Sequence, residues 1–295
     1  MFMFNLSSLS FSSLNINRVT HDICSRSQVG IIALAMLISG CNPLNAVTSE
    51  KAQKAKVPLF TGFTVEAQLD GSPVPTLLAT RGELIVEDDC SEDRRRGLGF
   101  WSLSQTEPNV CRVSHDVDRK PKHVPIASYS LDEHENIIVE VTFRWGEPLG
   151  GQYNDQLLGI FSDLRPNEIK GHKIESWISG TERFTSPGLA FTSSIAPGVR
   201  LDEHPSDTFQ ANTWYTAVLE VVGNEALLRS LDQVAYVDRP RISGAKNKIT
   251  LIFGTTWHEI KRVRIWHAEE NPAWKNMKDR ALAKRQPYSQ NAFSY

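Results

Sequence analysis

Three polar side chains that alternate with apolar ones are the first candidates for chemistry in this sequence. In residues 137–145 every second residue is apolar, and Glu140, Thr142 and Arg144 fall between them. Alternate residues of a strand lie on opposite faces, so these three side chains share one face of a sheet. Glu140 and Arg144 are candidate catalytic groups, and Thr142 and Arg144 are candidate ligand contacts, because a guanidinium donates in a planar fork to keto or hydroxyl oxygens. The alternative is an ordinary solvent-facing side of a half-covered sheet.

Two histidines and a tryptophan add to this set. An imidazole titrates near neutral pH, so His172 is a candidate base. Trp257 and His258 fall in a predicted loop, residues 254–259, and loops of this kind often present binding residues. The ring of Trp257 can stack against the apolar face of a sugar. It could equally close one end of a sandwich, and each histidine has an ordinary structural alternative.

Other kinds of chemistry lack their usual patterns. Glycoside hydrolysis needs two carboxyl groups facing each other, and no strand here carries the Glu-x-Asp-x-x-Glu pattern of laminarinase-type jelly rolls. Residues 132–135 come closest, but they read as a solvated turn, and Asp202-Glu203-His204 reads as a polar loop. The histidines lack zinc-ligand spacing, and neither a phosphate-binding glycine loop nor a nucleophile elbow is present. We therefore expect no metal and no cofactor.

Cysteine usage points to an oxidising compartment. Cys90 and Cys111 remain after the N-terminal cysteines are set aside, and they enclose a polar, irregular segment. A disulfide closing a loop of this length would stabilise the fold by about 3 kcal/mol. The alternative, a metal site, would require further ligands at short spacing.

The N-terminal region has the features of an export signal. Basic residues precede a charge-free apolar run at residues 29–38, which is too short to span a membrane. Ile38-Ser39-Gly40-Cys41 resembles the bacterial lipobox, which implies a signal peptide at 1–40, lipidation of Cys41 and a tether at 41–56. The expected location is the bacterial cell envelope, lipid-anchored at the outer membrane and facing the periplasm. The formal net charge of −2 argues against nucleic acid as a partner.

The rest of the chain has the pattern of an all-β domain. Short alternating segments separated by Gly, Pro, Asn and Ser predict two packed antiparallel sheets over 57–268, with Gly223-Asn224 as a hairpin turn. Trp145, Trp214 and Trp266 fall in predicted strands and are expected in the core. A C-terminal helix is predicted at 269–285, capped by Asn271 and packed through Trp274, before a tail at 286–295.

Several segments of the C-terminal half resemble a known family. They are NTWYTAVLEVVGNE (212–225), Leu231-Asp232, RVRIWHA (262–268) and Asn-Pro-Ala-Trp (271–274). Together they resemble the 3-keto-disaccharide hydrolase domain family, and Gly171-His172 resembles a piece of its lipoprotein relatives. The resemblance spans about residues 131 to 278 and implies a concanavalin-like jelly roll with a short C-terminal helix.

Function is predicted less narrowly than fold, because one architecture hosts many activities. We expect a membrane-anchored lipoprotein whose sandwich binds carbohydrate or cell-envelope glycan. The first alternative is a hydrolase of 3-keto-glycosides, as the resemblance implies. The second is a structural or protein-binding envelope component.

Overall fold

Two antiparallel sheets hold nearly all the regular structure that is described. The computed structural model describes residues 71–91, 101–103, 107–113, 126–147, 156–163, 172–181, 187–193, 199–206, 208–283 and 285. The predicted signal peptide, Cys41 and the tether lie outside these residues, as does Gly171. No helix in the described residues is both long and apolar enough to cross a membrane.

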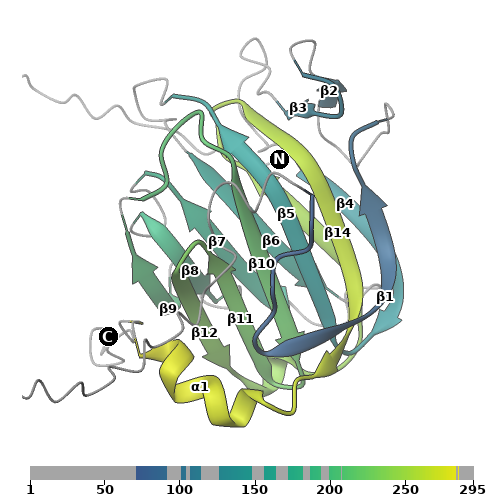
Figure 1. Ribbon diagram of the computed structural model, residues 1–295, viewed down its shortest axis with the longest axis vertical. Helices are drawn as coiled ribbons and strands as arrows, with labels where there is room; N and C mark the ends of the chain where they lie inside the picture. The colour runs from purple at the N-terminus through teal and green to yellow at the C-terminus, as the bar shows by residue number, and fades with distance from the viewer. Residues whose placement is uncertain are drawn as a thin grey trace, which may run out of the picture. The chain divides into compact units, whose positions relative to one another are not determined.

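The first sheet has eight strands, of which seven follow the order β12-β11-β10-β5-β14-β3-β2 (Figure 1). The eighth, β1, pairs with residues 263–270 of β14, on the edge whose first residues, 258–260, pair with β3. Its strands are β1 (Ala79–Asp88), β2 (Trp101–Leu103), β3 (Cys111–Val113), β5 (Ile137–Trp145), β10 (Tyr215–Val222), β11 (Glu225–Ser230), β12 (Gln233–Asp238) and β14 (His258–Glu270).

The second sheet has six strands in the order β4-β13-β6-β7-β8-β9. They are β4 (Ile126–His134), β6 (Leu157–Asp163), β7 (Ile174–Ser179), β8 (Gly188–Thr192), β9 (Arg200–Pro205) and β13 (Lys246–Phe253). Every pairing in both sheets is antiparallel, which confirms the predicted all-β sandwich of the jelly-roll class.

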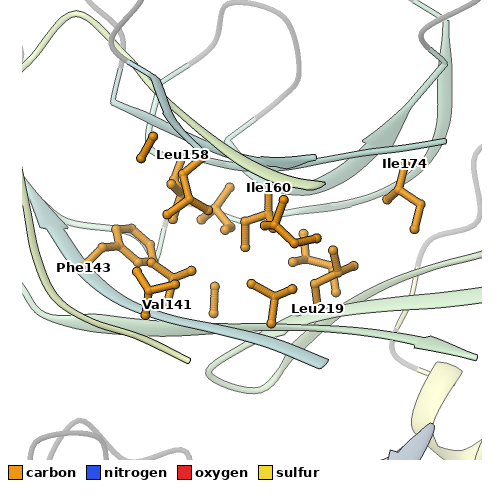
Figure 2. Packing of buried hydrophobic residues seen from close by; sticks show 14 of the residues in the cluster. Val141, Phe143, Leu158, Ile160, Ile174 and Leu219 are labelled. Atoms are coloured by element: carbon orange, nitrogen blue, oxygen red, sulfur yellow. The ribbon is translucent and has the colours of Figure 1, made fainter. Parts of the chain in front are cut away.

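The core lies between the sheets and follows from the alternation in β5. The odd-numbered residues of β5, Ile137 to Trp145, are apolar, point inward with no exposed surface and meet apolar residues of the second sheet, as Val141, Phe143, Leu158 and Ile160 do in Figure 2. Each fully buried side chain of this size contributes roughly 1.5–3 kcal/mol. Trp145 belongs to this layer, as predicted. The same alternation turns Glu140, Thr142 and Arg144 to the outer face of the eight-stranded sheet.

The turn between β10 and β11 has the residues that a tight hairpin needs. Val222 pairs with Glu225, so Gly223 and Asn224 form a two-residue hairpin loop in which Gly223 has φ of 53°. Glycine takes this left-handed value without a Cβ clash, and the predicted hairpin is confirmed.

The C-terminal helix starts later than predicted. A 3-10 turn η1 (Pro240–Ile242) joins β12 to β13, and α1 (Trp274–Leu282) follows β14. The N-cap residue is Ala273 and has no side-chain cap, so the prediction of Asn271 as the cap is wrong. Asn271 lies before the helix and accepts the N–H of Ala273 with its side chain and that of Trp274 with its backbone carbonyl. Trp274 is buried outside the sandwich against β11 and β12, as predicted.

Two segments predicted as loops are strands. Asp132, Glu133 and His134 end β4 and do not form a turn, because the β4–β5 reversal comes after them at Glu135-Asn136. Asp202-Glu203-His204 lies in β9, where Asp202 is buried. The acidic residues in these two strands favoured a loop on composition alone, and the pairing of the strands outweighs that preference.

The predicted disulfide is present. Cys90 and Cys111 are bonded, with their Cα atoms 5.4 Å apart. The bond ties the end of β1 to β3, so the two strands that flank β14 on the same side are linked covalently.

Candidate functional site

Among the described residues, the outer face of the eight-stranded sheet has a region that residues 71–78 cover and a region that they leave uncovered, which we call the open region. Residues 71–78, which we name the strap, run across β5 and β10 before entering β1 (Figure 1). The strap covers Glu140 on β5 and Glu220 on β10. Beyond it, the same face continues to Arg144 and the strand ends.

Glu140 is held under the strap. One carboxylate oxygen accepts the backbone N–H of Val74 at 2.9 Å and a guanidinium hydrogen of Arg81 at 3.1 Å, and the other accepts from Arg264. Only 2% of Glu140 is exposed. The expectation that Glu140 projects into an open cleft as a catalytic group is therefore wrong, because one of its oxygens accepts from Val74 of the strap and from Arg81, and the other accepts from Arg264.

Glu220 fixes the strap in the same way from the neighbouring strand. Its Oε2 accepts the backbone N–H groups of Leu77 and Ala79 at 2.9 and 3.0 Å, and its Oε1 accepts from Arg229 Nε at 3.0 Å. Arg229 also donates to the carbonyl of Pro75. The Glu220 and Arg229 side chains are both fully buried. A charge buried this deeply is tolerated only when paired and hydrogen-bonded, which is the case here.

Thr142 lies at the border of the strap and offers little surface. Its hydroxyl lies 3.0 Å from that of Thr216, and the residue is buried. The space beside Glu140, Thr142 and Thr216 is a cavity of about 10 Å³, which holds about one water molecule. A sugar ring does not fit there, so the prediction of Thr142 as a ligand contact is not supported by this geometry.

Arg144 is the centre of the open region. Its Nε donates to Glu259 at 2.6 Å, and its NH2 donates to Glu107 at 2.6 Å. The guanidinium carbon lies 4.6 Å from the centre of the Trp214 ring, a cation–π distance. Burial lowers the pKa of Arg144, but its hydrogen bonds to the two glutamates outweigh burial and leave the pKa raised. The charge on Arg144 is thus permanent.

A second arginine–tryptophan pair lies on the other side of Glu259. Arg112 is 3.8 Å from Glu259 Oε1, and its guanidinium stacks 4.5 Å from the centre of the Trp257 ring. The open region is therefore a row in which an aromatic ring, a cation, an anion, a cation and an aromatic ring follow one another. We call this row the Trp214–Trp257 row; its members are Trp214, Arg144, Glu259, Arg112 and Trp257.

Strand register builds this row. In the β5–β14 pairing Arg144 lies opposite Glu259, and in the β14–β3 pairing Glu259 lies opposite Arg112. Directly opposed residues on one face have their Cβ atoms about 5 Å apart, within ion-pair reach for long side chains. Trp257 packs against the backbone at Gly146, where a Cβ atom would come within 2.2 Å of the indole nitrogen.

The two tryptophans were not equally predictable. Both are half-buried. Trp257 was predicted as a ligand contact on a rim, and the structure places it at the end of the row. Trp214 was expected in the core, which is wrong: it precedes β10 and its ring lies under Arg144 on the outer face. Trp266 is buried as expected, but in a small outer cluster with Ile138 rather than between the sheets.

His258 does not take part in the row. It is the first residue of β14 and is fully buried, with Nδ1 2.8 Å from the carbonyl oxygen of Thr256. Burial lowers its pKa to about 4, although the hydrogen bond to Thr256 opposes the shift. The prediction of His258 as a ligand contact is wrong for this structure, because no atom of the side chain reaches the surface.

His172 lies beside the other sheet. Its Nδ1 is 2.7 Å from Asp163 Oδ1, and its ring packs 4.7 Å from that of Phe161. It therefore does not join Glu140 and Arg144 in one site, and the three predicted catalytic residues do not converge. Among the described residues, no group of three or more His, Cys, Asp or Glu side chains could hold a metal ion.

Comparisons with known proteins identify no family for this chain. No protein-family model matches the chain, and no curated protein matches its sequence. Solved structures with a similar fold include CG-16, a homodimeric agglutinin from chicken liver, at 6% identity over 48% of this chain and 98% of that one, with a TM-score of 0.37. A protein of unknown function with a galectin-like fold from Bacillus subtilis matches at 12% identity over 66% and 100%, with a TM-score of 0.46. A Bacillus licheniformis β-glucanase matches at 14% identity over 66% and 94%, with a TM-score of 0.40.

Proposed function

We propose that this protein binds carbohydrate, in particular cell-envelope glycan, through the Trp214–Trp257 row. The observation that carries the proposal is that two partly exposed indole rings flank two arginines that one buried glutamate holds in place on the outer face of the eight-stranded sheet. An aromatic face attracts the weakly positive C–H groups of a sugar, and guanidinium groups at fixed positions donate hydrogen bonds to its hydroxyls. Because Arg144 and Arg112 are already held by Glu259, they are ordered before a ligand arrives, which lowers the entropic cost of binding.

The same geometry favours binding over hydrolysis. A pair of catalytic carboxyl groups needs one member that holds a proton for the leaving group. In the open region Glu259 and Glu107 both accept hydrogen bonds from Arg144. Glu140 is covered by the strap. The 3-keto-glycoside hydrolase that the sequence resemblance implies is therefore an outcome to test and not our proposal.

A glycan array followed by calorimetry on the best glycan tests the proposal. Trp214→Ala and Trp257→Ala should each weaken binding by tenfold or more, since the loss of a stacked ring costs at least about 1.4 kcal/mol. Trp177→Ala is the matched control, because Trp177 is also half-buried but lies on β7 in the other sheet. Absence of any bound glycan, or an equal loss in Trp177→Ala, would contradict the proposal. Release of monosaccharide from a 3-keto-disaccharide would instead favour the hydrolase.

We also propose that the chain is a lipid-anchored protein of the bacterial cell envelope, at the outer membrane and facing the periplasm. The Cys90–Cys111 disulfide supports export, because such bonds persist in oxidising compartments. The lipobox-like sequence that ends at Cys41 supports the anchor. Radiolabelled palmitate should be incorporated into the full chain and not into Cys41→Ser, and incorporation into neither would refute the anchor.

A further inference from the structure

A second cavity lies at an end of the sandwich far from the Trp214–Trp257 row. It has a volume of about 290 Å³ and is lined by β7, β8 and β9 of one sheet, by the end of β12 in the other, and by η1. Figure 2 shows Ile174, one of its lining residues, at the opposite end of the core from Phe143. The row and this cavity are therefore separate features of the fold.

The inner wall of the cavity is apolar. Four of its residues, Ile174, Phe191, Val237 and Ile242, belong to the buried core cluster, and Leu201 packs against that cluster. Core side chains normally interdigitate and leave few voids larger than a water molecule. A space of this size between them is near the lower end of the range found for small-molecule sites.

The rim of the cavity is predominantly cationic. Lys173, Arg239 and Arg241 line it, and Glu175 is its sole acidic lining residue among those described. Glu175 is already engaged, because its Oε2 accepts the hydroxyl hydrogen of Thr192, whose oxygen in turn accepts from Trp177 Nε1. This concentration of positive charge contrasts with the formal net charge of −2 for the whole chain.

Lys173 is held with its charge at the rim. Its Nζ donates to the carbonyl of Ser243 at 2.8 Å, and Arg241 Nε donates to the carbonyl of His172 at 3.1 Å, so both cations are anchored by backbone groups. Within the part of the chain that is described, no carboxylate forms an ion pair with Lys173 or Arg239. Burial lowers the pKa of Lys173, and the charge of Arg241 lowers it further. An anion bound next to Lys173 would offset the repulsion between Lys173 and Arg241.

We infer that this cavity binds a small amphipathic anion, with an apolar body against Ile174, Phe191 and Ile242 and one carboxylate or sulfonate at Lys173 and Arg239. The apolar body of the ligand matches the apolar inner wall of the cavity, and its anionic group matches the cationic rim. Burying the apolar body removes hydrocarbon surface from water, and the anionic head exchanges water for charge-assisted hydrogen bonds. The inference concerns a site separate from the proposed glycan site and does not depend on it.

Decanoate is the probe that tests the inference, with decanol and decyltrimethylammonium as head-group controls. Binding is measured by displacement of fluorescent anilinonaphthalene sulfonate, which is itself an apolar anion, and by calorimetry. Decanoate should bind with one-to-one stoichiometry and at least tenfold more tightly than either control ligand. No binding of decanoate, or equal binding of decanol, would overturn the inference.

Variants locate the effect. Lys173→Met and Arg239→Gln should each weaken decanoate about tenfold and leave decanol unchanged, whereas Lys275→Gln, an exposed lysine on α1, should change neither. Arg239 is exposed, so its variant tests the head-group contact even if Lys173→Met fails to fold. Leu201→Trp, which adds volume inside the cavity, should reduce both ligands together. Unchanged decanoate affinity in Arg239→Gln and Leu201→Trp would place the bound anion elsewhere and refute the site.

Discussion

The buried imidazole of His258 should make the fold sensitive to acid. Its pKa is lowered from 6.5 to about 4 in the folded protein, so the folded state keeps it neutral where the unfolded chain binds a proton. Between those two values the unfolded state holds more protons, and stability therefore rises with pH. The contribution is complete above pH 6.5 and is lost as the pH falls toward 4. At 1.36 kcal/mol per pH unit, the loss amounts to about 3 kcal/mol.

Replacing His258 with asparagine isolates this effect. Asparagine can still donate to the carbonyl of Thr256, the bond that His258 Nδ1 makes, but it does not titrate. Urea unfolding followed by tryptophan fluorescence, at intervals from pH 4 to pH 7.5, gives the free energy of unfolding of each protein. The difference between wild type and His258→Asn should fall by about 3 kcal/mol from pH 7 to pH 4.

The wild-type curve alone does not show this effect. Burial raises the pKa of Asp202 from 3.8 to about 6, against the opposing hydrogen bond from Tyr236 N–H and the charge of Arg285. For Asp202 the folded state holds more protons between pH 3.8 and 6, so its contribution falls as the pH rises and opposes that of His258. Subtracting the variant from the wild type removes the Asp202 contribution. A difference that stays constant across this range would refute our account of His258 as a buried neutral group.

Three further predictions follow from the same contacts. In the same unfolding series, the free energy of unfolding of Asp202→Asn minus that of wild type should rise by about 2 kcal/mol from pH 4 to pH 7, because the variant lacks the carboxyl group whose contribution falls over that range. A fall in this difference would contradict the prediction. Arg229→Met should lower the free energy of unfolding by about 3–5 kcal/mol, because it leaves the buried charge of Glu220 without its partner. The double variant Arg229→Met/Glu220→Gln should lose less stability than Arg229→Met alone, and a loss equal to the sum of the two single variants in urea unfolding would argue against the pair. Gly146→Ala should displace the Trp257 ring and weaken glycan binding as Trp257→Ala does, with little loss of stability; unchanged binding would show that the ring position does not matter.

Local periodicity predicted the sandwich because burial in a sheet repeats every two residues. The alternation in residues 137–145 located β5 with its observed ends, and Gly223-Asn224 located the hairpin after β10. Two strands that contain acidic residues were not predicted. In one, Asp202 is buried and accepts a hydrogen bond from the N–H of Tyr236; in the other, Asp132 is exposed near the end of the strand. In these strands the alternation that marks a half-buried strand is broken.

The candidate site was less predictable because it depends on contacts between distant residues. Glu140 lies under the strap and accepts a hydrogen bond from Val74, which is 66 residues away in the sequence. No pattern near Glu140 indicates this contact. The row likewise depends on Arg144 lying opposite Glu259, a register that includes an irregularity between Ile260 and Arg262. The alternation did predict that Arg144 leaves the core. It did not identify Glu259 and Arg112 as the partners of Arg144 on that face.

The strap also sets a limit on how short this domain can be made. Two acidic side chains inside the protein receive their backbone donors from Val74, Leu77 and Ala79. In a chain that started beyond this segment, Glu140 and Glu220 would keep their arginine partners but lose their backbone hydrogen-bond donors. The apolar surface that Leu77 and Leu78 cover would also be exposed to water. The smallest stable fragment should therefore begin at or before residue 71, eight residues ahead of the first strand.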